Sequence, residues 1–398
     1  MDKKCRLLHE INIDEAYMNI NNRMNKKLLM LLCLALVIYI IDSQTEVPVL
    51  EDTSIPVGME IPAKKKTFEE FVGIAKNIDP LYPIGLPYTK YPDLVLPTYI
   101  KYRENLLTPV VDQGKCASCW AISVCHVIQD RISLYTGGKI KRPLSYQELL
   151  SCFNVKGDLG CTEGGSPEQA YEYIVNNGIA SAQDYPYEQF KTNDIVKCEP
   201  FRKQGLRTYI QRNSVRSLCI DPSMYKKGSK KWQSVINQNM RNMCTELFLN
   251  GPIVTTIQVF SSIYNFDGLS IYDPDDKDLG KYIGGHAVVC VGAVMDEVNG
   301  EEPGFDGKYY IIKNSWSASH PIKSPASKGF FYIRAGKNVC GIESRASTCQ
   351  ISMTDEIKGN MVGSLDESRY LTYQSYVSDP ERQLFITKST RLRSMLRT

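Results

Sequence analysis

Three stretches in the second half of the chain have the pattern of β-strands. Residues 250–260 alternate apolar and polar positions and are rich in β-branched side chains, residues 284–292 form a second stretch, and residues 308–312 begin a third. Strands that succeed one another without intervening helices pair in an antiparallel sheet or a barrel. We therefore expect the second half of the chain to be built on antiparallel β-structure.

Helical patterns precede these strands. An apolar run beginning at Trp120 predicts a helix from about Cys119 onward, after a loop that ends at Ser118. A second helix is expected over residues 144–152, because Ser145 followed three positions later by Glu148 is a capping-box start. Residues 199–243 are strongly basic, and we interpret them as a solvated surface insertion rather than a polyanion or membrane site.

The N-terminal part carries one uninterrupted apolar run, residues 28–41. These fourteen residues are fewer than the roughly 20 that span a bilayer as a helix, and with two preceding lysines they fit a signal peptide. The region after them, residues 41–43, is not a small-x-small cleavage site, so a signal-anchor remains open, as does a buried core helix. We assign 1–27 as a polar tail and 28–42 as signal peptide or signal-anchor.

Residues 43–95 differ in character from the rest of the chain. A short helix-like stretch over 67–77 is followed by prolines at positions 80, 83, 87, 92 and 97, which forbid a long helix and favour an extended path. This segment is a propeptide lying along a cleft, or a plain proline-rich linker. We place the start of the main domain at residue 96 and its end at residue 350, with 351–398 as a C-terminal extension of unknown role.

Composition excludes some classes of protein. The 398 residues have the apolar and charged content of a globular chain. A formal net charge of +3 is too weak to indicate nucleic-acid binding. Thirteen cysteines suggest an oxidising compartment.

Cys119 is the candidate nucleophile. A thiol attacks a carbonyl carbon only as the thiolate, which a helix N-terminus and a neighbouring imidazolium both favour. Gln113, six residues earlier, could direct a side-chain N–H toward the oxyanion that forms on attack. Two other interpretations exist. Cys116 and Cys119 have the spacing of a redox Cys-x-x-Cys motif, but no βαβ alternation surrounds them. Half of a zinc site would need a second Cys/His pair, and none is convincing.

The chain has four histidines that could act as the base. His9 precedes the apolar run, and His320 lies in a Ser/Pro-rich loop. His126 is seven residues along the same helix as Cys119, about 10 Å away by helix rise, which is too far for a hydrogen bond. His286 begins a strand in Gly-Gly-His-Ala, where rigid backbone can hold a ring. We select His286.

Asn314 is the candidate orienter of that base. It ends the third strand, and its side-chain carbonyl would accept a hydrogen bond from the His286 ring and fix the tautomer. Trp316 would shield that bond from water.

Residues 110–122 closely resemble the nucleophile segment of the papain-like cysteine proteases, whose signature is Cys-Gly-(Ser/Ala)-Cys-(Trp/Tyr). Residues 309–316 resemble the family's Lys-Asn-Ser-Trp segment, and residues 284–287 and 329–344 read like cathepsin B-like members. The resemblance implies an α+β, papain-like two-domain fold. In it a helical disulfide-stapled domain and an antiparallel β-barrel-like domain enclose the active-site cleft.

The resemblance also implies particular residue roles. It implies disulfides Cys116–Cys161 and Cys152–Cys198, and a Gly164–Gly165 segment that binds extended substrate through its backbone. Ala287 and Trp316 would line the same cleft. The remaining cysteines have no assignable partners, although Cys219–Cys244 is one conceivable pair; they are Cys125, Cys219, Cys244, Cys290, Cys340 and Cys349.

The chain departs from the family pattern in five respects. Ala117 replaces a glycine, and Thr162-Glu163 replaces one residue before the Gly-Gly segment. The second Trp-Gly of the family is missing from residues 317–328, and the paired histidines of the cathepsin B occluding loop are absent. Without that pair we expect an endopeptidase. Arg345 stands where cathepsin B has a glutamate in its second specificity subsite, so it would disfavour basic and tolerate acidic substrate residues, unless it turns outward to solvent.

The expected activity is therefore that of a secreted or lumen-facing thiol protease made as a zymogen. Such an enzyme needs peptide or protein substrates, no cofactor and no metal, and we expect a monomer, secreted or lysosome-like, with membrane attachment through 28–41 if that run is an anchor. The alternative is a catalytically silent papain-fold protein that binds peptides or partners through its cleft. A dead homologue has no chemical need to keep Gln113, Cys119, His286 and Asn314 together.

Overall fold

The computed structural model describes residues 96–97, 99–153, 161, 164–188, 197–199, 205–266, 268, 270–295, 308–317 and 328–362. All of them belong to one compact unit, residues 65–398. The expectations for 1–95, for the segments 154–160 and 318–327 and for the end of the chain after 362 lie outside the described residues. Among the described residues, no helix combines the length and apolarity needed to cross a membrane.

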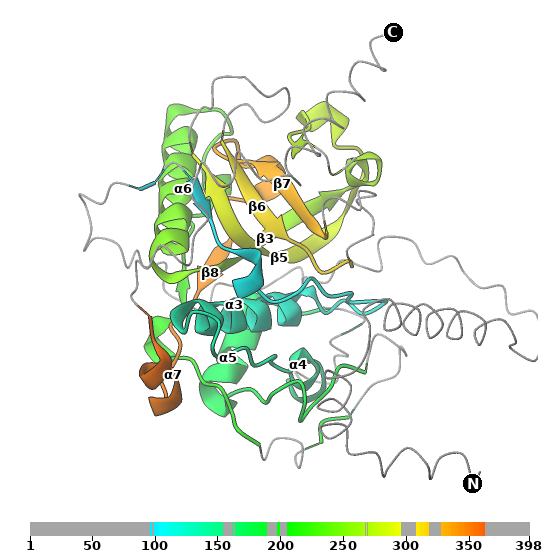
Figure 1. Ribbon diagram of the computed structural model, residues 1–398. Helices are drawn as coiled ribbons and strands as arrows, with labels where there is room; N and C mark the ends of the chain where they lie inside the picture. The colour runs from blue at the N-terminus through cyan, green and yellow to red at the C-terminus, as the bar shows by residue number, and fades with distance from the viewer. Residues whose placement is uncertain are drawn as a thin grey trace, which may run out of the picture. The chain divides into compact units, whose positions relative to one another are not determined.

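An eight-stranded sheet forms the centre of this unit (Figure 1). Its strands are β1 (Tyr99–Lys101), β2 (Arg216–Ser217), β3 (Ile253–Phe260), β4 (Ile271–Tyr272), β5 (Tyr282–Val294), β6 (Tyr309–Lys313), β7 (Phe330–Arg334) and β8 (Ala346–Thr348). The order is β2-β8-β3-β5-β6-β7-β4, with β1 paired to β5. The three strands predicted from alternation are β3, β5 and β6, which are neighbours.

The sheet differs from the expectation in two details. Its order has two ends among the described strands, so it is open where a barrel-like closure was expected. The short β4 pairs with β7 in parallel, whereas the other pairs are antiparallel. A strand of two residues is too short to produce an alternation pattern in the sequence, and its parallel direction could not be predicted from the sequence either.

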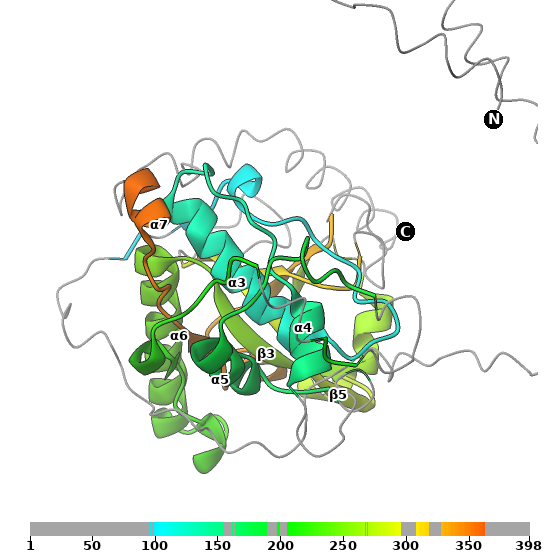
Figure 2. The ribbon, with the colours of Figure 1, turned by 90° about the horizontal axis from the view of Figure 1, so that it is seen from below.

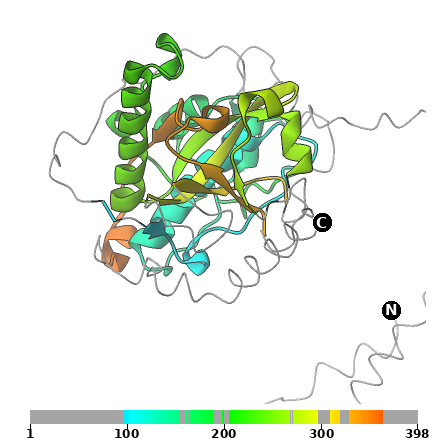
Figure 3. The ribbon, with the colours of Figure 1, turned by 90° about the horizontal axis from the view of Figure 1, so that it is seen from above.

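Helices cover both faces of the sheet. They are α3 (Cys119–Tyr135), α4 (Tyr146–Cys152), α5 (Pro167–Asn177), α6 (Lys230–Asn250) and α7 (Asp355–Asn360). From below, α3, α4 and α5 lie in front of the sheet (Figure 2), and from above α6 stands along the sheet as a long helix (Figure 3). Alternate residues of β5 serve the two sides: Val289 and Val291 join the core with α3, and Val288 and Cys290 join the core with α6.

Helix α6 corrects the interpretation of residues 199–243 as a solvated insertion. Ser229 accepts a hydrogen bond from Trp232 N–H and starts the helix. Its buried residues recur at helical spacing and face the sheet; they include Trp232, Val235, Ile236, Asn239, Met243 and Leu247. The lysines that dominated the sequence pattern are exposed at the start of the helix.

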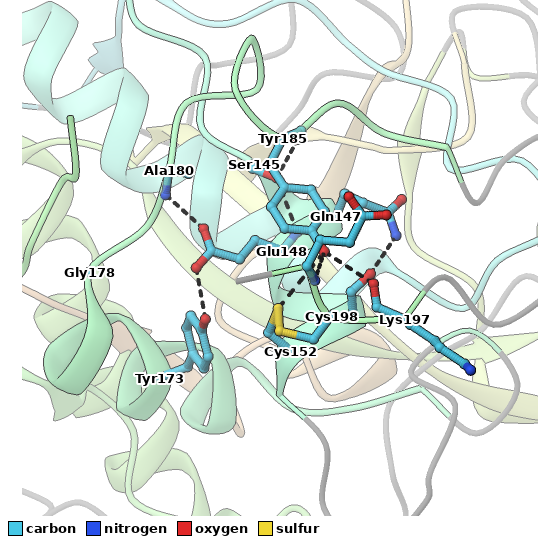
Figure 4. Close-up of a disulfide and its surroundings, with 12 residues drawn as sticks. Ser145, Gln147, Glu148, Cys152, Tyr173, Gly178, Ala180, Tyr185, Lys197 and Cys198 are labelled. Carbon is cyan, nitrogen blue, oxygen red and sulfur yellow. Dashed lines mark hydrogen bonds between the residues drawn. A yellow bond between two sulfur atoms is a disulfide. The ribbon is translucent and has the colours of Figure 1, made fainter. Parts of the chain in front are cut away.

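Helix α4 begins as predicted, but only half of the capping box forms. Ser145 Oγ accepts from Glu148 N–H at 3.0 Å. The Glu148 carboxylate instead accepts from Tyr173 Oη–H at 2.7 Å and from Ala180 N–H at 2.9 Å (Figure 4). It also accepts from Arg207. Fully buried, this carboxylate joins α4 to α5 and to the segment that comes after α5.

Both disulfides implied by the resemblance are present. Cys116–Cys161 ties the loop before α3 to the segment before α5, and Cys152–Cys198 closes the end of α4 (Figure 4). Cys219 and Cys244 are both buried free thiols, so the conceivable pairing between them is wrong. Their spacing along the chain contains no information on the distance between them in the fold.

Candidate active site

Cys119 is the first residue of α3 and is fully buried. Ser118 precedes it without capping the helix through its side chain. The Sγ atom of Cys119 accepts a hydrogen bond from the backbone N–H of Ala287, at 3.5 Å. The fold therefore brings the start of α3 to the residue directly after His286 on β5.

The other buried thiols are poor nucleophiles. Burial raises the pKa of Cys290, Cys340 and Cys349 to about 12, and it also raises the pKa values of Cys125, Cys219 and Cys244. Cys116 is bonded to Cys161, so a resolving thiol at Cys-x-x-Cys spacing is not available to Cys119. This excludes the redox interpretation.

His286 is held from two sides. Its Nε2 lies 2.8 Å from Asn314 Oδ1, and its ring stacks on Trp316 with centroids 4.2 Å apart and planes 18° from parallel. Asn314 Oδ1 also accepts from Ser315 N–H at 2.8 Å, which identifies that atom as the amide oxygen. Nε2 must then carry the proton, and Nδ1 is the basic nitrogen.

The second ring nitrogen of His286, Nδ1, is not occupied by a hydrogen bond to any described residue. Nδ1 of His286 is buried and has no hydrogen-bond partner among the described residues. Burial lowers the pKa of His286 to about 4, and the bond to Asn314 only partly opposes this. Burial therefore favours the neutral form of the imidazole.

Gln113 lies beside the same residues. Its Nε2 donates to Cys116 O at 2.9 Å, its Oε1 accepts from Ser315 Oγ–H at 2.7 Å, and its backbone N–H donates to Ser315 O at 2.8 Å. Ser315 was not singled out in the sequence, yet it fixes both Gln113 and Asn314. Its position inside the Asn-Ser-Trp triplet was the available signal.

The Gly164–Gly165 segment packs closely against the residue after Cys119. A Cβ on Gly165 would lie 2.5–2.9 Å from the indole ring of Trp120, and Gly164 has a φ of +76°. Cys161 O accepts from Ala117 N–H at 2.9 Å. Ala117 is not among the described residues with positive φ, so the turn accommodates alanine in place of the family's glycine.

A cavity of about 340 Å³ includes Gly285, the residue before His286, in its wall. Gly285, Cys340 and Ser344 contribute to its wall, together with Arg345 and Asp221. Arg345 is exposed, and its guanidinium makes no hydrogen bond or ion pair with any described residue. Sequence reasoning identified Arg345 but missed Asp221, which comes from the segment before α6 where the resemblance is weak.

His126, the other histidine that the structure describes, is not part of the candidate active site. His126 lies on α3, buried, and its pKa is lowered by burial and by the charge of Lys313. This agrees with a packing role. His9 and His320 lie outside the described residues.

Comparison with known proteins places this arrangement in a family. The model of the papain family of cysteine proteases matches residues 96–350, which is more than half of the chain. The chain therefore belongs to the papain family of cysteine proteases.

Its similarity to individual members is moderate. A gut-specific cysteine proteinase of Caenorhabditis elegans is 29% identical over 233 residues, 58% of this chain and 65% of that protein. Cathepsin B-like cysteine proteinase 3 of the same organism is 28% identical over 244 residues, 60% of each chain. The chain thus spans less than two-thirds of the length of these relatives. Procathepsin B S9 of Trypanosoma congolense matches in fold, with a TM-score of 0.52 and 24% identity, over 72% of this chain and 88% of that one.

Proposed function

We propose that this protein is a cysteine-type endopeptidase that uses Cys119 as nucleophile, His286 as base and Asn314 as orienter of the base. The observation that carries the proposal is the contact between Cys119 Sγ and Ala287 N–H, directly beside a histidine that Asn314 and Trp316 hold. Family membership supports the reaction class.

The proposed reaction follows from the roles of Cys119, His286 and Gln113. Nδ1 of His286 takes the proton from the Cys119 thiol, and the thiolate attacks the peptide carbonyl. The Gln113 side-chain amide stabilises the oxyanion, the leaving amine takes the proton back from His286, and water then hydrolyses the thioester. Because burial is what lowers the pKa of His286, hydration of the site would raise that pKa toward its ordinary value and favour the thiolate–imidazolium pair.

The substrate would lie across residues from both halves of the unit. Gly164 and Gly165 would offer backbone hydrogen bonds, and Ala287 and Trp316 would line the opposite wall. The cavity that Gly285 helps to line would take a substrate side chain. The Arg345 guanidinium, which has no partner among the described residues, would disfavour basic side chains there and tolerate acidic ones.

Profiling a peptide library tests this specificity. The enzyme is expected to cleave poorly those peptides that place Lys or Arg in the subsite of Arg345, and Arg345→Gln should increase their cleavage because it removes the like charge. An undiminished preference for Arg in the unaltered enzyme rules out this role for Arg345.

The remaining segments fit a processed, exported enzyme. We propose that 28–42 directs the chain into the secretory route or anchors it there, that 43–95 is a propeptide, and that 96–350 is the peptidase domain. The mature protein would be a monomer in a secreted or lysosome-like location, acting on peptide or protein substrates. The two disulfides support an oxidising compartment.

The competing function is a silent papain-fold protein that binds peptides through its cleft. Hydrolysis of an internally quenched peptide, blocked at both ends, by the purified protein separates the two. Cleavage that disappears in Cys119→Ala and His286→Ala and falls in Asn314→Ala supports an endopeptidase. Peptide binding without cleavage, unchanged by these substitutions, supports the silent protein.

A further inference from the structure

Three segments that contribute to the candidate active site meet at one buried ion pair. Asp130 Oδ2 and Lys313 Nζ lie 2.6 Å apart, and both side chains are fully buried. Asp130 is on α3, eleven residues after Cys119, and Lys313 is the last residue of β6, directly before Asn314. The pair therefore joins the element that carries the nucleophile to the strand that ends at the orienter.

Thr108 completes this cluster. Its N–H donates to Asp130 Oδ1 at 2.6 Å, and its Oγ1 and carbonyl oxygen accept from Lys313 Nζ at 2.6 and 3.3 Å. Lys313 thus uses all three of its N–H donors, and Asp130 uses both of its oxygens. Thr108 lies five residues before Gln113, so the cluster also fixes the start of the segment that bears the oxyanion donor.

A closed network of this kind has only one good arrangement. A buried charge that loses its partner is strongly unfavourable, so helix, strand and loop cannot slide past one another without breaking the pair. Asp130 is about 16 Å from Cys119 by helix rise, and it touches no reacting atom. Any effect it has on the reaction must pass through the placement of other residues.

We propose that Asp130 and Lys313 are positioning residues, which with Thr108 hold Cys119, Asn314 and Gln113 in their mutual geometry. This rests on the function proposed above. Displacement of reacting groups by about 1 Å can lower a rate by about a hundredfold, so loss of the pair should act on kcat far more than on KM.

A neighbouring ion pair supplies a matched control. Arg131, the next residue of α3, pairs with Glu246 of α6 at 2.8 Å, and both side chains are as deeply buried. Arg131 also donates to the carbonyl oxygens of Pro252 and Cys349. This pair connects α3 to α6, and it contacts none of the residues proposed to act in catalysis.

The test compares full-length protein carrying Asp130→Asn, Lys313→Met, both together, or Glu246→Gln. We expect each single change in the Asp130–Lys313 pair to lower kcat by about tenfold or more, with KM within about twofold, and to slow epoxide alkylation of Cys119 in parallel. The double variant buries no unpaired charge and should regain at least part of the loss. Lys313→Arg, which keeps the charge, should retain more activity than Lys313→Met. Glu246→Gln should lower the melting temperature but leave kcat and the alkylation rate unchanged.

The outcomes separate the two proposals. If unaltered protein hydrolyses peptides while all Asp130 and Lys313 variants, the double included, keep its kcat and alkylation rate, the positioning role is wrong and the pair only stabilises the fold. A kcat loss of the same size in Glu246→Gln would contradict it as well. If unaltered protein neither cleaves peptides nor shows selective alkylation of Cys119, the proposed function itself fails, and the positioning role fails with it.

Discussion

The protonation states of individual residues in this protein depend on burial as well as on the type of side chain. The bond from His286 Nε2 to Asn314 leaves Nδ1 as the only basic nitrogen, and burial keeps the ring neutral. The sequence could indicate His286 and Asn314 because the residues around them have strand patterns and resemble the corresponding segments of the family. It could not indicate Ser315 as the link between Asn314 and Gln113, because that link spans more than 200 residues.

Glu343 carries the clearest pH prediction. It is fully buried and accepts hydrogen bonds from Tyr310 Oη–H, Gly336 N–H and Asn338 N–H, at 2.9, 2.6 and 2.7 Å. Burial outweighs these donors and raises the pKa of Glu343 to about 7. Between pH 4.5 and 7 the folded protein therefore binds more protons at this site than the unfolded chain, so its contribution to stability is lost as pH rises through this window.

We predict that Glu343→Gln removes this dependence. The free energy of unfolding of the unaltered protein minus that of the variant should fall on the order of 3 kcal/mol from about pH 4.5 to about pH 7.5. Urea unfolding at several pH values measures it, with exposed Glu172→Gln as control. A difference that stays constant with pH would show that Glu343 titrates normally.

Helices and strands with a strong local pattern in the sequence were predicted correctly. The start of α3 at Cys119 and the strands β3, β5 and β6 were predictable from apolar runs and alternation. Helix α5 was not predicted, although Ser166 and Gln169 form a complete capping box and Pro167 stands in the first turn. Helix α6 was missed because lysines just before it and in its first turn give residues 199–243 the composition of a solvated segment.

Other features of the elements are set by distant residues. Glu148 turns from its predicted capping partner to Tyr173 and Arg207, which lie 25 and 59 positions away. The parallel pairing of β4 with β7 likewise joins residues about 60 positions apart. A local pattern contains neither partner, so neither could be predicted.

Gly165 provides a prediction at this scale. A methyl group on residue 165 would overlap the Trp120 ring and displace the first turn of α3 from its packing position. Gly165→Ala should cost about 1–3 kcal/mol of stability and lower kcat/KM by about tenfold or more. Gly359→Ala is the control, because that glycine lies in α7 with open space around it and should gain up to about 1 kcal/mol. Equal activity of both variants would show that Trp120 does not have to stay in place.

In the whole molecule, the candidate site lies where the helical layer meets the sheet. Cys119 comes from α3, and His286 and Asn314 come from β5 and the end of β6. The buried Asp130–Lys313 pair joins α3 to β6, whereas the buried Arg131–Glu246 pair joins α3 to α6. The α+β class and the family were predictable, because the site segments are short and distinctive; the two-sided packing of the sheet was not.

The segment after residue 350 is part of this unit, at least as far as it is described. Ile357 of α7 is 5% exposed and belongs to the core with α3. Arg142 bonds both oxygens of Glu356, at 3.0 and 3.1 Å, and Val362 N–H donates to Tyr135 O at 2.8 Å. Residues 351–362 therefore cover the end of α3, a packing role that the sequence did not show.

Ile357→Ala should accordingly destabilise the whole unit. We expect a loss of about 2–5 kcal/mol, as for other buried aliphatic side chains cut back to alanine. Met361→Ala, at a position 47% exposed, should change stability by less than about 0.5 kcal/mol. Thermal unfolding measures both. Equal melting temperatures of Ile357→Ala and the unaltered protein would show that packing of α7 does not stabilise the unit.

The central claim is that Cys119 is a thiolate nucleophile activated by His286. The most direct test is reaction of the purified protein at mildly acidic pH with an epoxide that alkylates papain-type thiolates, followed by peptide mapping. The account predicts one label per molecule, on Cys119, which is lost in His286→Ala. Labels spread over several cysteines and indifferent to His286 would contradict it, and the chain would then share the papain fold without its chemistry.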